Sequence, residues 1–440
     1  MLKLGLAALA LVTCAPLSAQ QVSADWVRAH ETFLAGDELA GRGSATRDEA
    51  IAAAYVATQF QAYGLKPPPG MTGYIQKAPV SRRFVAGAPS LTLGDAPIAG
   101  LTLGRAPGGT VTGRAQVART ASRIRTGAPI VIYTGPADDF AAAIGAARDK
   151  GASLIIGPAP DKPGPAWAVG RPLGVRLADD AEPGLTIAML PPATLADLAR
   201  RAGRQTIRFD LPFREERAET TNAIGYLPGT DPAAGILLLS AHLDHLGVED
   251  GTIMHGANDD ASGTVAVLEL ARTLAAGKPM KRGILFGAFG AEELGLLGSK
   301  YFGTHLPVPV ERIAANIEFE MIGAQDPKLP RGALMMTGFE RSDLGERLAA
   351  RGARLAPDPY PDQNFFRRSD NYSLALRGVV AHTLSGWAVV PTYHQPTDTI
   401  AAIDFPFMTQ AIAALVDPIR NLADSHAAPT WKPGGRPKAD

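Results

Sequence analysis

Side chains that can bind a metal ion follow three apolar segments of this sequence, each at the point where the segment ends. The segments and the side chains after them are 236–240 with His242 and Asp244, 284–289 with Glu292 and Glu293, and 313–319 with Glu320. Two further groups, Asp259-Asp260 and Tyr393-His394, stand outside these segments. In open α/β sheets, functional groups gather beyond the carboxyl ends of the strands. We therefore expect these side chains to meet in one site.

The number of candidate ligands favours two metal ions over one. Imidazole nitrogens and carboxylate oxygens are ligands of zinc, and a catalytic zinc keeps one position of its small shell open. Five such side chains, too many for one catalytic ion, occur here: His242, Asp259, Glu293, Glu320 and His394. They suit two ions if one carboxylate bridges them, and Asp259 is the natural bridge.

Two acidic residues stand beside the ligands without being needed as ligands. Glu292 precedes Glu293 and is free to take a proton from a water bound between the metal ions. Asp244 stands two residues after His242, so that its carboxylate can orient the other ring nitrogen of that histidine. We expect His245 to form a hydrogen bond near the site rather than to bind a metal, and the remaining five histidines to be structural.

Each motif alone also has an ordinary structural interpretation. Glu292-Glu293 could be a solvated helix start, where carboxylates favour the N-terminal dipole. Asp259-Asp260 could cap the following helix, a role that is compatible with metal binding. Tyr393 could simply pack beside its neighbour. The ordered combination of all these groups favours a metal site.

Five motifs of the sequence occur in the order typical of one enzyme family. They are SAHLD at 240–244, GANDDASG at 256–263, AEELG at 291–295, EMIG at 320–323 and YHQPTDT at 393–399. Together they resemble the co-catalytic zinc exopeptidases, the family that includes secreted bacterial leucyl aminopeptidases and glutamate carboxypeptidase. The resemblance covers about residues 222–399.

The resemblance implies a specific assignment of ligands to two zinc ions. His242, Asp259 and Glu320 would hold one ion. Asp259, Glu293 and His394 would hold the other. Many relatives carry Asp where this sequence has Glu320, which leaves the terminal specificity open more than the metal site.

The resemblance also implies roles for other side chains of the same motifs. Glu292 would be the general base, and Tyr393 would steady the tetrahedral intermediate. The peptide bond between Asp259 and Asp260 would be cis.

The elements that must position these residues predict an α/β fold. The apolar runs at 236–240, 284–289, 313–319 and 379–384 alternate with amphipathic helical segments at 264–276, 294–302 and 407–422. Buried strands that alternate with helices indicate a mostly parallel central sheet flanked by helices. The resemblance implies the same architecture, the phosphorylase/hydrolase-like fold of zinc exopeptidases.

The chain of 440 residues exceeds what one hydrophobic core usually organises, so we expect more than one domain. We divide it into a signal peptide at 1–19, parts of the zinc peptidase domain at 20–84 and 214–425, an insert at 85–213, and a disordered tail at 426–440. The insert alternates strands and helices and is similar to a smaller α/β protease-associated domain. It clusters no His, Asp or Glu, so we expect no chemistry of its own there.

Composition and the first residues restrict partners and location. Lys plus Arg and Asp plus Glu each total 43, a balance that argues against nucleic-acid binding. A basic start, an apolar run to Val12 and small residues up to Ala19 predict a cleaved signal peptide and a secreted or periplasmic protein. Cys14, the only cysteine, leaves lipid attachment as an alternative. No later segment indicates a membrane span.

The sequence therefore predicts a zinc-dependent exopeptidase that acts on peptides, with an aminopeptidase favoured. A carboxypeptidase or dipeptidase is the alternative if the loop with Arg367 and Arg368 grips a carboxylate. Glutaminyl cyclisation uses one zinc in related folds, and the presence of both His242 and Glu293 speaks against it. A binding module that had lost its chemistry would be expected to lack ligands. Oligomeric state, the role of the insert, the physiological metal and the preferred side chain stay open.

Overall fold

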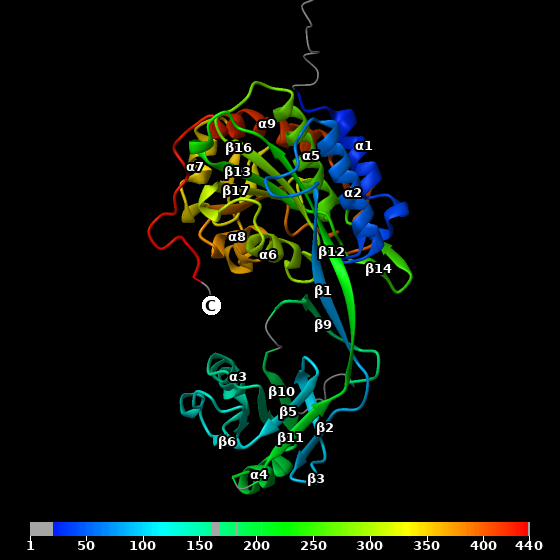
Figure 1. Ribbon diagram of the computed structural model, residues 1–440, viewed down its shortest axis with the longest axis vertical. Coiled ribbons are helices and arrows are strands. Elements are labelled where there is room, and N and C mark those ends of the chain that lie inside the picture. The colour runs from blue at the N-terminus through cyan, green and yellow to red at the C-terminus, as the bar shows by residue number, and fades with distance from the viewer. Residues whose placement is uncertain (1–20, 161–166, 181–183, 204, 439–440) are drawn as a thin grey trace, which may run out of the picture. The chain divides into compact units, whose positions relative to one another are not determined.

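The computed structural model describes residues 21–160, 167–180, 184–203 and 205–438 (Figure 1). The chain forms two compact units, one made of residues 1–78 and 219–440 and the other of Pro79–Ala218. The sequence suggested an insert at 85–213. The difference lies in strands β1 (Ile75–Val85) and β12 (Phe213–Leu227), each of which begins in one unit and ends in the other. The predicted signal peptide and Cys14 lie outside the described residues.

The first unit is built on a sheet whose centre is parallel, as predicted. Strands β13 (Ile236–His242), β16 (Gly283–Phe289), β17 (Ile313–Glu320) and β20 (Ala381–Ser385) run parallel to one another. The strand order is β19-β18-β20-β17-β13-β16-β12-β1-β9, with β18 (Leu334–Met336) antiparallel to β20 and β12 antiparallel to β16. The last strand, β9 (Pro172–Leu177), pairs with β1. β19 is Leu355–Pro357. All seven residues of β13 are buried, which explains why its sequence is apolar without alternation.

Helices cover both faces of this sheet. Leu237 and Leu239 of β13 pack in one hydrophobic cluster with helices α1, α2, α5, α7 and α9, whereas Leu238 packs in another cluster with α6 and α8. The helices are α1 (Ala24–Leu34), α2 (Arg47–Ala62), α5 (Ser262–Ala275), α6 (Leu297–Thr304), α7 (Leu344–Ala349), α8 (Asn371–Leu376) and α9 (Phe405–Ala423). A short hairpin, β14 (Gly247–Glu249) with β15 (Thr252–Met254), follows β13. This arrangement is the predicted α/β fold.

The second unit contains the strand and helix alternation expected of the insert, together with a second sheet. Its five-stranded sheet has the order β4-β10-β8-β7-β6, and its four-stranded sheet has the order β3-β2-β11-β5. The strands are β2 (Ser90–Leu93), β3 (Ala96–Pro97), β4 (Thr102–Arg105), β5 (Gly109–Gly113), β6 (Ala115–Ala118), β7 (Ile130–Tyr133), β8 (Leu154–Pro158), β9 (Pro172–Leu177), β10 (Thr186–Leu190) and β11 (Ile207–Leu211). The helices are α3 (Phe140–Asp149) and α4 (Pro192–Arg201).

The C-terminal tail is ordered as far as residue 438, so the prediction of disorder from residue 426 was wrong. Trp431 packs against both hydrophobic clusters of the first unit and donates a hydrogen bond from its indole to the carbonyl of Gly378 at 3.0 Å. Ser342 forms a β-bridge with the same tryptophan. One partly buried aromatic side chain thus holds a segment whose Pro, Gly and Lys content is typical of disorder.

None of the helices in the described residues has the length and apolar character needed to cross a bilayer.

Candidate metal centre

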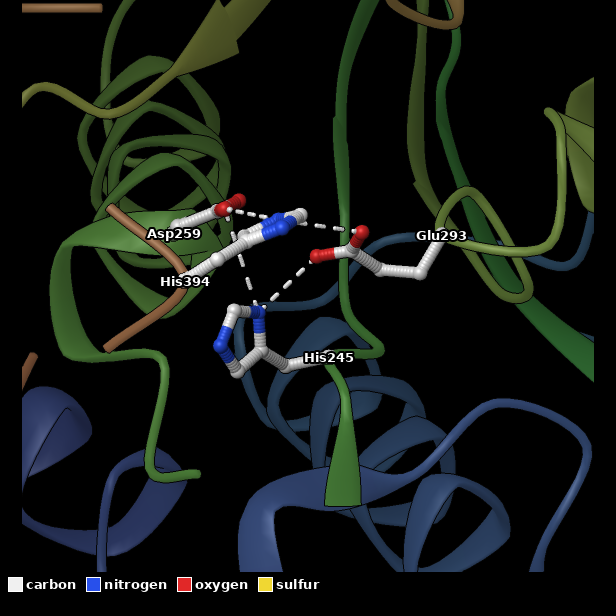
Figure 2. A group of neighbouring side chains, drawn as sticks. All are labelled: His245, Asp259, Glu293 and His394. Atoms are coloured by element: carbon white, nitrogen blue, oxygen red, sulfur yellow. Dashed lines mark hydrogen bonds and ion pairs between the residues drawn. The ribbon is translucent and has the colours of Figure 1, made fainter. Parts of the chain in front are cut away.

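The five predicted ligands lie together at the carboxyl ends of the central strands. Two groups of ligand atoms form there, each with all its atoms within 4.8 Å of one another. One group is His242, Asp259 and Glu320; the other is His245, Asp259, Glu293 and His394 (Figure 2). The two groups bring together the residues that the resemblance pairs, and the second group also contains His245.

Asp259 is shared by both groups, and its two oxygens face different histidines. Oδ1 lies 3.2 Å from Nε2 of His242, and Oδ2 lies 3.2 Å from Nε2 of His394. Oε2 of Glu293 lies 3.3 Å from the same nitrogen of His394. A carboxylate with one oxygen directed to each group has the geometry needed to bridge two cations.

Several atoms of this cluster are buried without a hydrogen-bond partner. They are Nε2 of His242, His245 and His394, and Oδ2 of Asp259. Buried polar atoms nearly always have partners, so each such atom requires an explanation. The other ring nitrogen of His242 is already occupied by the backbone oxygen of Asp244, at 3.1 Å. Nε2 of His242 is therefore left for a metal ion, and the residues present fit two cations with nitrogen and oxygen ligands.

His245 was not expected among the candidate ligands. Its Nδ1 lies 2.9 Å from Oε1 of Glu293 and 3.9 Å from Oδ2 of Asp259 (Figure 2). The contact with Glu293 is the hydrogen bond near the site that the sequence predicted. The imidazole can therefore orient that carboxylate, as residues behind a metal ligand commonly do.

The loop from 257 to 261 carries Asp259 in front of α5. The peptide bond between Asp259 and Asp260 is cis, as the resemblance implied. Asp398 accepts hydrogen bonds from the backbone of Asn258 and of Asp259, each at 3.0 Å. The buried carboxylate of Asp260 accepts from the backbone of Met321 at 2.9 Å. These bonds fix the loop relative to the end of β17.

Asp244 acts differently from the prediction. Its carboxylate lies 3.7 Å from Nδ1 of His242, which bonds the backbone oxygen of Asp244 instead. The carboxylate accepts the backbone N–H groups of Glu292 at 3.0 Å and of Glu293 at 3.4 Å. Because β13 turns immediately after His242, the carboxylate reaches the neighbouring loop rather than the ring. Asp244 therefore positions the loop that bears the candidate base.

Burial in a crowd of carboxylates governs the electrostatics of the site. Burial raises the pKa of Glu292 well above its usual range, and Glu320, Asp370 and Glu293 add to this effect while His242 opposes it. Burial, followed by the nearby charge of Glu318, raises the pKa of Glu320 to about 8. Such an acidic cluster needs positive charge to stay ionised at neutral pH, which bound cations would supply.

An N-terminal segment that the sequence analysis missed holds the loops of the site. The guanidinium of Arg42 is fully buried and donates to four backbone carbonyls. These belong to Leu243 (2.7 Å), Leu34 (2.5 Å), His255 (2.8 Å) and Gly256 (2.8 Å). The bonds to Leu243 and Gly256 tie together the two loops that carry His242 and Asp259.

Two neighbours of Arg42 complete this contact. The hydroxyl of Ser44 donates to Asp244 at 2.5 Å. The buried carboxylate of Glu49 accepts the backbone N–H of Ala291, next to Glu292, at 2.9 Å, and burial raises its pKa to about 8. Residues 42–49 therefore support the site from behind without contributing a ligand.

We expect Arg42→Met to lower the free energy of unfolding by about 3–5 kcal/mol, because it removes the buried cation and leaves four carbonyls without their donor. Urea denaturation followed by circular dichroism measures this change. Arg47→Met is the matched control, since Arg47 is exposed and its removal should change stability by no more than about 0.5 kcal/mol. Equal, small changes in the two variants would show that the buried arginine does not support the fold.

A pocket of about 470 Å³ opens onto the ligands. Asp259, Glu292, Glu293 and Glu320 form part of its lining. Tyr393 also lines it and stacks on the ring of His394, with ring centroids 3.9 Å apart. Tyr393 therefore packs against His394 and also lines the pocket, so the structure is compatible with both the packing role and the catalytic role.

Comparison with known proteins relates the part of the chain that carries the paired ligand groups to a family of peptidases. Residues 222–417, which are slightly less than half of the chain, match the model of peptidase family M28. The match covers all the candidate ligands.

Two curated proteins, one of them named as an aminopeptidase, match parts of the chain. The chain is 40% identical over 117 residues to leupeptin-inactivating enzyme 1 of Streptomyces exfoliatus, which is 26% of this chain and 25% of that protein. It is 29% identical over 205 residues to the probable lipoprotein aminopeptidase LpqL of Mycobacterium tuberculosis, which is 40% of each chain. The matched regions thus span a quarter to two fifths of these relatives.

Solved structures show the same fold over nearly the whole chain. An aminopeptidase from Aneurinibacillus sp. strain AM-1 has a TM-score of 0.56 at 22% identity, covering 92% of this chain and 95% of that one. BSAP, a zinc aminopeptidase from Bacillus subtilis, has a TM-score of 0.53 at 20% identity, covering 93% and 97%.

Proposed function

We propose that this protein is a two-zinc exopeptidase that releases residues from the N-termini of peptides. The observation that carries the proposal is the carboxylate of Asp259, which directs one oxygen toward His242 and the other toward His394. The nitrogen and oxygen ligands fit zinc, and one of the two relatives and both structures with the same fold are named as aminopeptidases.

The reaction would be hydrolysis of one peptide bond. Bound zinc would supply Lewis-acid chemistry that polarises the scissile carbonyl and acidifies a water molecule. Glu292, which is no member of either ligand group, would accept a proton from that water and deliver it to the leaving amine. The hydroxyl group goes to the carbonyl carbon, the bond from carbon to nitrogen breaks, and the amine leaves with the proton. Tyr393 lines the pocket where it could donate a hydrogen bond to the developing oxyanion.

Mass spectrometry of a mixed peptide library incubated with zinc-loaded protein tests this proposal. We expect loss of single residues from free N-termini, and we expect a chelator to abolish it. Trimming from the C-terminus, or of dipeptides alone, would keep the metal chemistry and change the specificity. Cleavage that persists after complete removal of the metal would contradict the proposal.

Histidines 245 and 394 should have different effects on metal binding. We expect His394→Asn to lose one of two zinc ions, because it removes a direct ligand. His245→Asn should keep both ions but lower the zinc affinity of one site by about 10- to 100-fold, because it removes only the hydrogen bond that orients Glu293. Metal content after dialysis and calorimetric zinc titration measure both effects. Loss of a whole ion from the His245 variant would make it a ligand instead.

We also propose that residues 1–19 direct export and are removed, and that the second unit is a protease-associated domain. The basic and apolar start of the chain supports the first proposal. Mass determination of the mature protein, expected to begin at Gln20, tests it.

A further inference from the structure

The pocket that holds the candidate ligands has one cationic side chain in its lining. That residue is Arg368, which follows Phe365 in the loop before α8. Its guanidinium carbon lies 4.9 Å from the centre of the Phe365 ring. Within the described part of the chain, this guanidinium forms neither an ion pair nor a hydrogen bond. Its donors are therefore available to a ligand.

Arg368 would determine the net charge of the pocket once the metal ions are bound. With two zinc ions bound, Asp259, Glu293, Glu320 and Glu292 would be ionised, and their four negative charges would balance the four positive charges of the ions. The metal centre would then be neutral. Arg368 would leave the pocket with a net positive charge, which favours a substrate group that is negatively charged.

A second group in the same pocket is also without a partner. Ser385, at the end of β20, is 2% exposed, lines the pocket, and has no hydrogen-bond partner for its hydroxyl. A buried hydroxyl without a partner is uncommon in folded proteins. It can donate to a carboxylate oxygen, as the guanidinium of Arg368 can.

The residues after Arg368 are held firmly in place. The hydroxyl of Ser369 donates to Glu318 at 2.6 Å, and the backbone N–H groups of Asp370 and Asn371 donate to it at 3.1 and 2.9 Å. Glu318 is fully buried in β17, two residues before Glu320. Arg368 therefore precedes a segment that is hydrogen-bonded to the strand that supplies a candidate ligand, and a backbone held in this way loses less entropy when a ligand binds.

We propose that Arg368 binds a carboxylate of the substrate, so that the enzyme prefers peptides with a carboxylate close to the scissile bond. The inference rests on the proposed peptidase function. Two sources supply this group: the side chain of an acidic terminal residue, and the terminal carboxylate of a very short peptide.

Matched pairs of substrates distinguish these sources. Amidated Glu-Ala-Ala and Gln-Ala-Ala differ only in the charge of the first side chain, and Ala-Ala and its amide differ only in the terminal carboxylate. For the pair that matches the true source, we expect kcat/KM to favour the carboxylate by about 10- to 100-fold. In Arg368→Gln this ratio should fall to about one.

Arg367→Gln is the matched control, because it removes the same charge from the neighbouring position, which does not line the pocket. We expect it to keep the wild-type ratio. A ratio near one in wild type for both pairs, or equal losses in the two variants, would overturn the proposal.

A binding measurement separates this proposal from the peptidase proposal. Calorimetry with the same peptides and zinc-loaded Glu292→Gln protein, with and without Arg368→Gln, should give the same preference in Kd. If wild-type protein cleaves none of the peptides, the peptidase proposal fails, and the ratio of Kd values alone then decides the role of Arg368. Absence of any preference in Kd would contradict that role directly.

Discussion

Glu292→Gln is expected to lower kcat by about 10²- to 10⁴-fold while both zinc ions stay bound. Glutamine has the same size and cannot accept the proton as a carboxylate does. The contact that places this residue is its backbone N–H to Asp244, which the substitution leaves intact. Turnover of an N-terminal substrate and metal content, measured on the same preparation, test both parts.

Glu293→Gln provides the matched control for this experiment. The two residues are adjacent, but only Glu293 belongs to a ligand group. We expect Glu293→Gln to weaken metal binding and Glu292→Gln to leave it unchanged. Unchanged turnover in the Glu292 variant, or an equal loss of metal in both, would exclude Glu292 as the base.

Asp259→Ala is expected to remove both metal ions and all measurable activity. Asp259 is the one residue shared by the two ligand groups, so its loss takes a ligand from each. It also leaves the buried imidazole of His242 beside Glu320 without the carboxylate that faces it. Metal analysis after dialysis should give no bound zinc in this variant and one ion in His394→Ala.

Circular dichroism of the same samples shows whether the fold is retained. Retention of one ion by a folded Asp259→Ala protein would mean that the two sites are independent and that Asp259 does not bridge them.

The fold and the candidate ligands could be predicted from the sequence for the same physical reason. Strands buried on both faces are mostly apolar, as residues 236–239 of β13 are, so a histidine or carboxylate at the end of such a strand is conspicuous. His242 and Glu320 stand at the last positions of β13 and β17, where the apolar pattern stops. The alternation in the insert was equally clear, since strand β7, helix α3 and strand β8 follow one another there.

The contacts that hold the loops and ligands of the site in place could not be predicted from the sequence in this way. Arg42 is 200 residues from the ligands in sequence and bonds to backbone carbonyls, which every residue has. The approach of His245 to Glu293 depends on how the chain turns after β13. The same turn sends the carboxylate of Asp244 toward the next loop rather than toward its own histidine. Periodicity and motif spacing contain no information about such contacts.

The buried carboxylate of Glu318 has a consequence for how this protein can adapt. It holds residues 369–371 through one hydroxyl and two backbone N–H groups, and none of these bonds involves the side chain of residue 368. The side chain at position 368 can therefore be replaced while the backbone after it stays bonded to Glu318 in β17, the strand that carries the candidate ligand Glu320. A single substitution at this position can thus change which substrates are preferred while the candidate metal ligands stay the same.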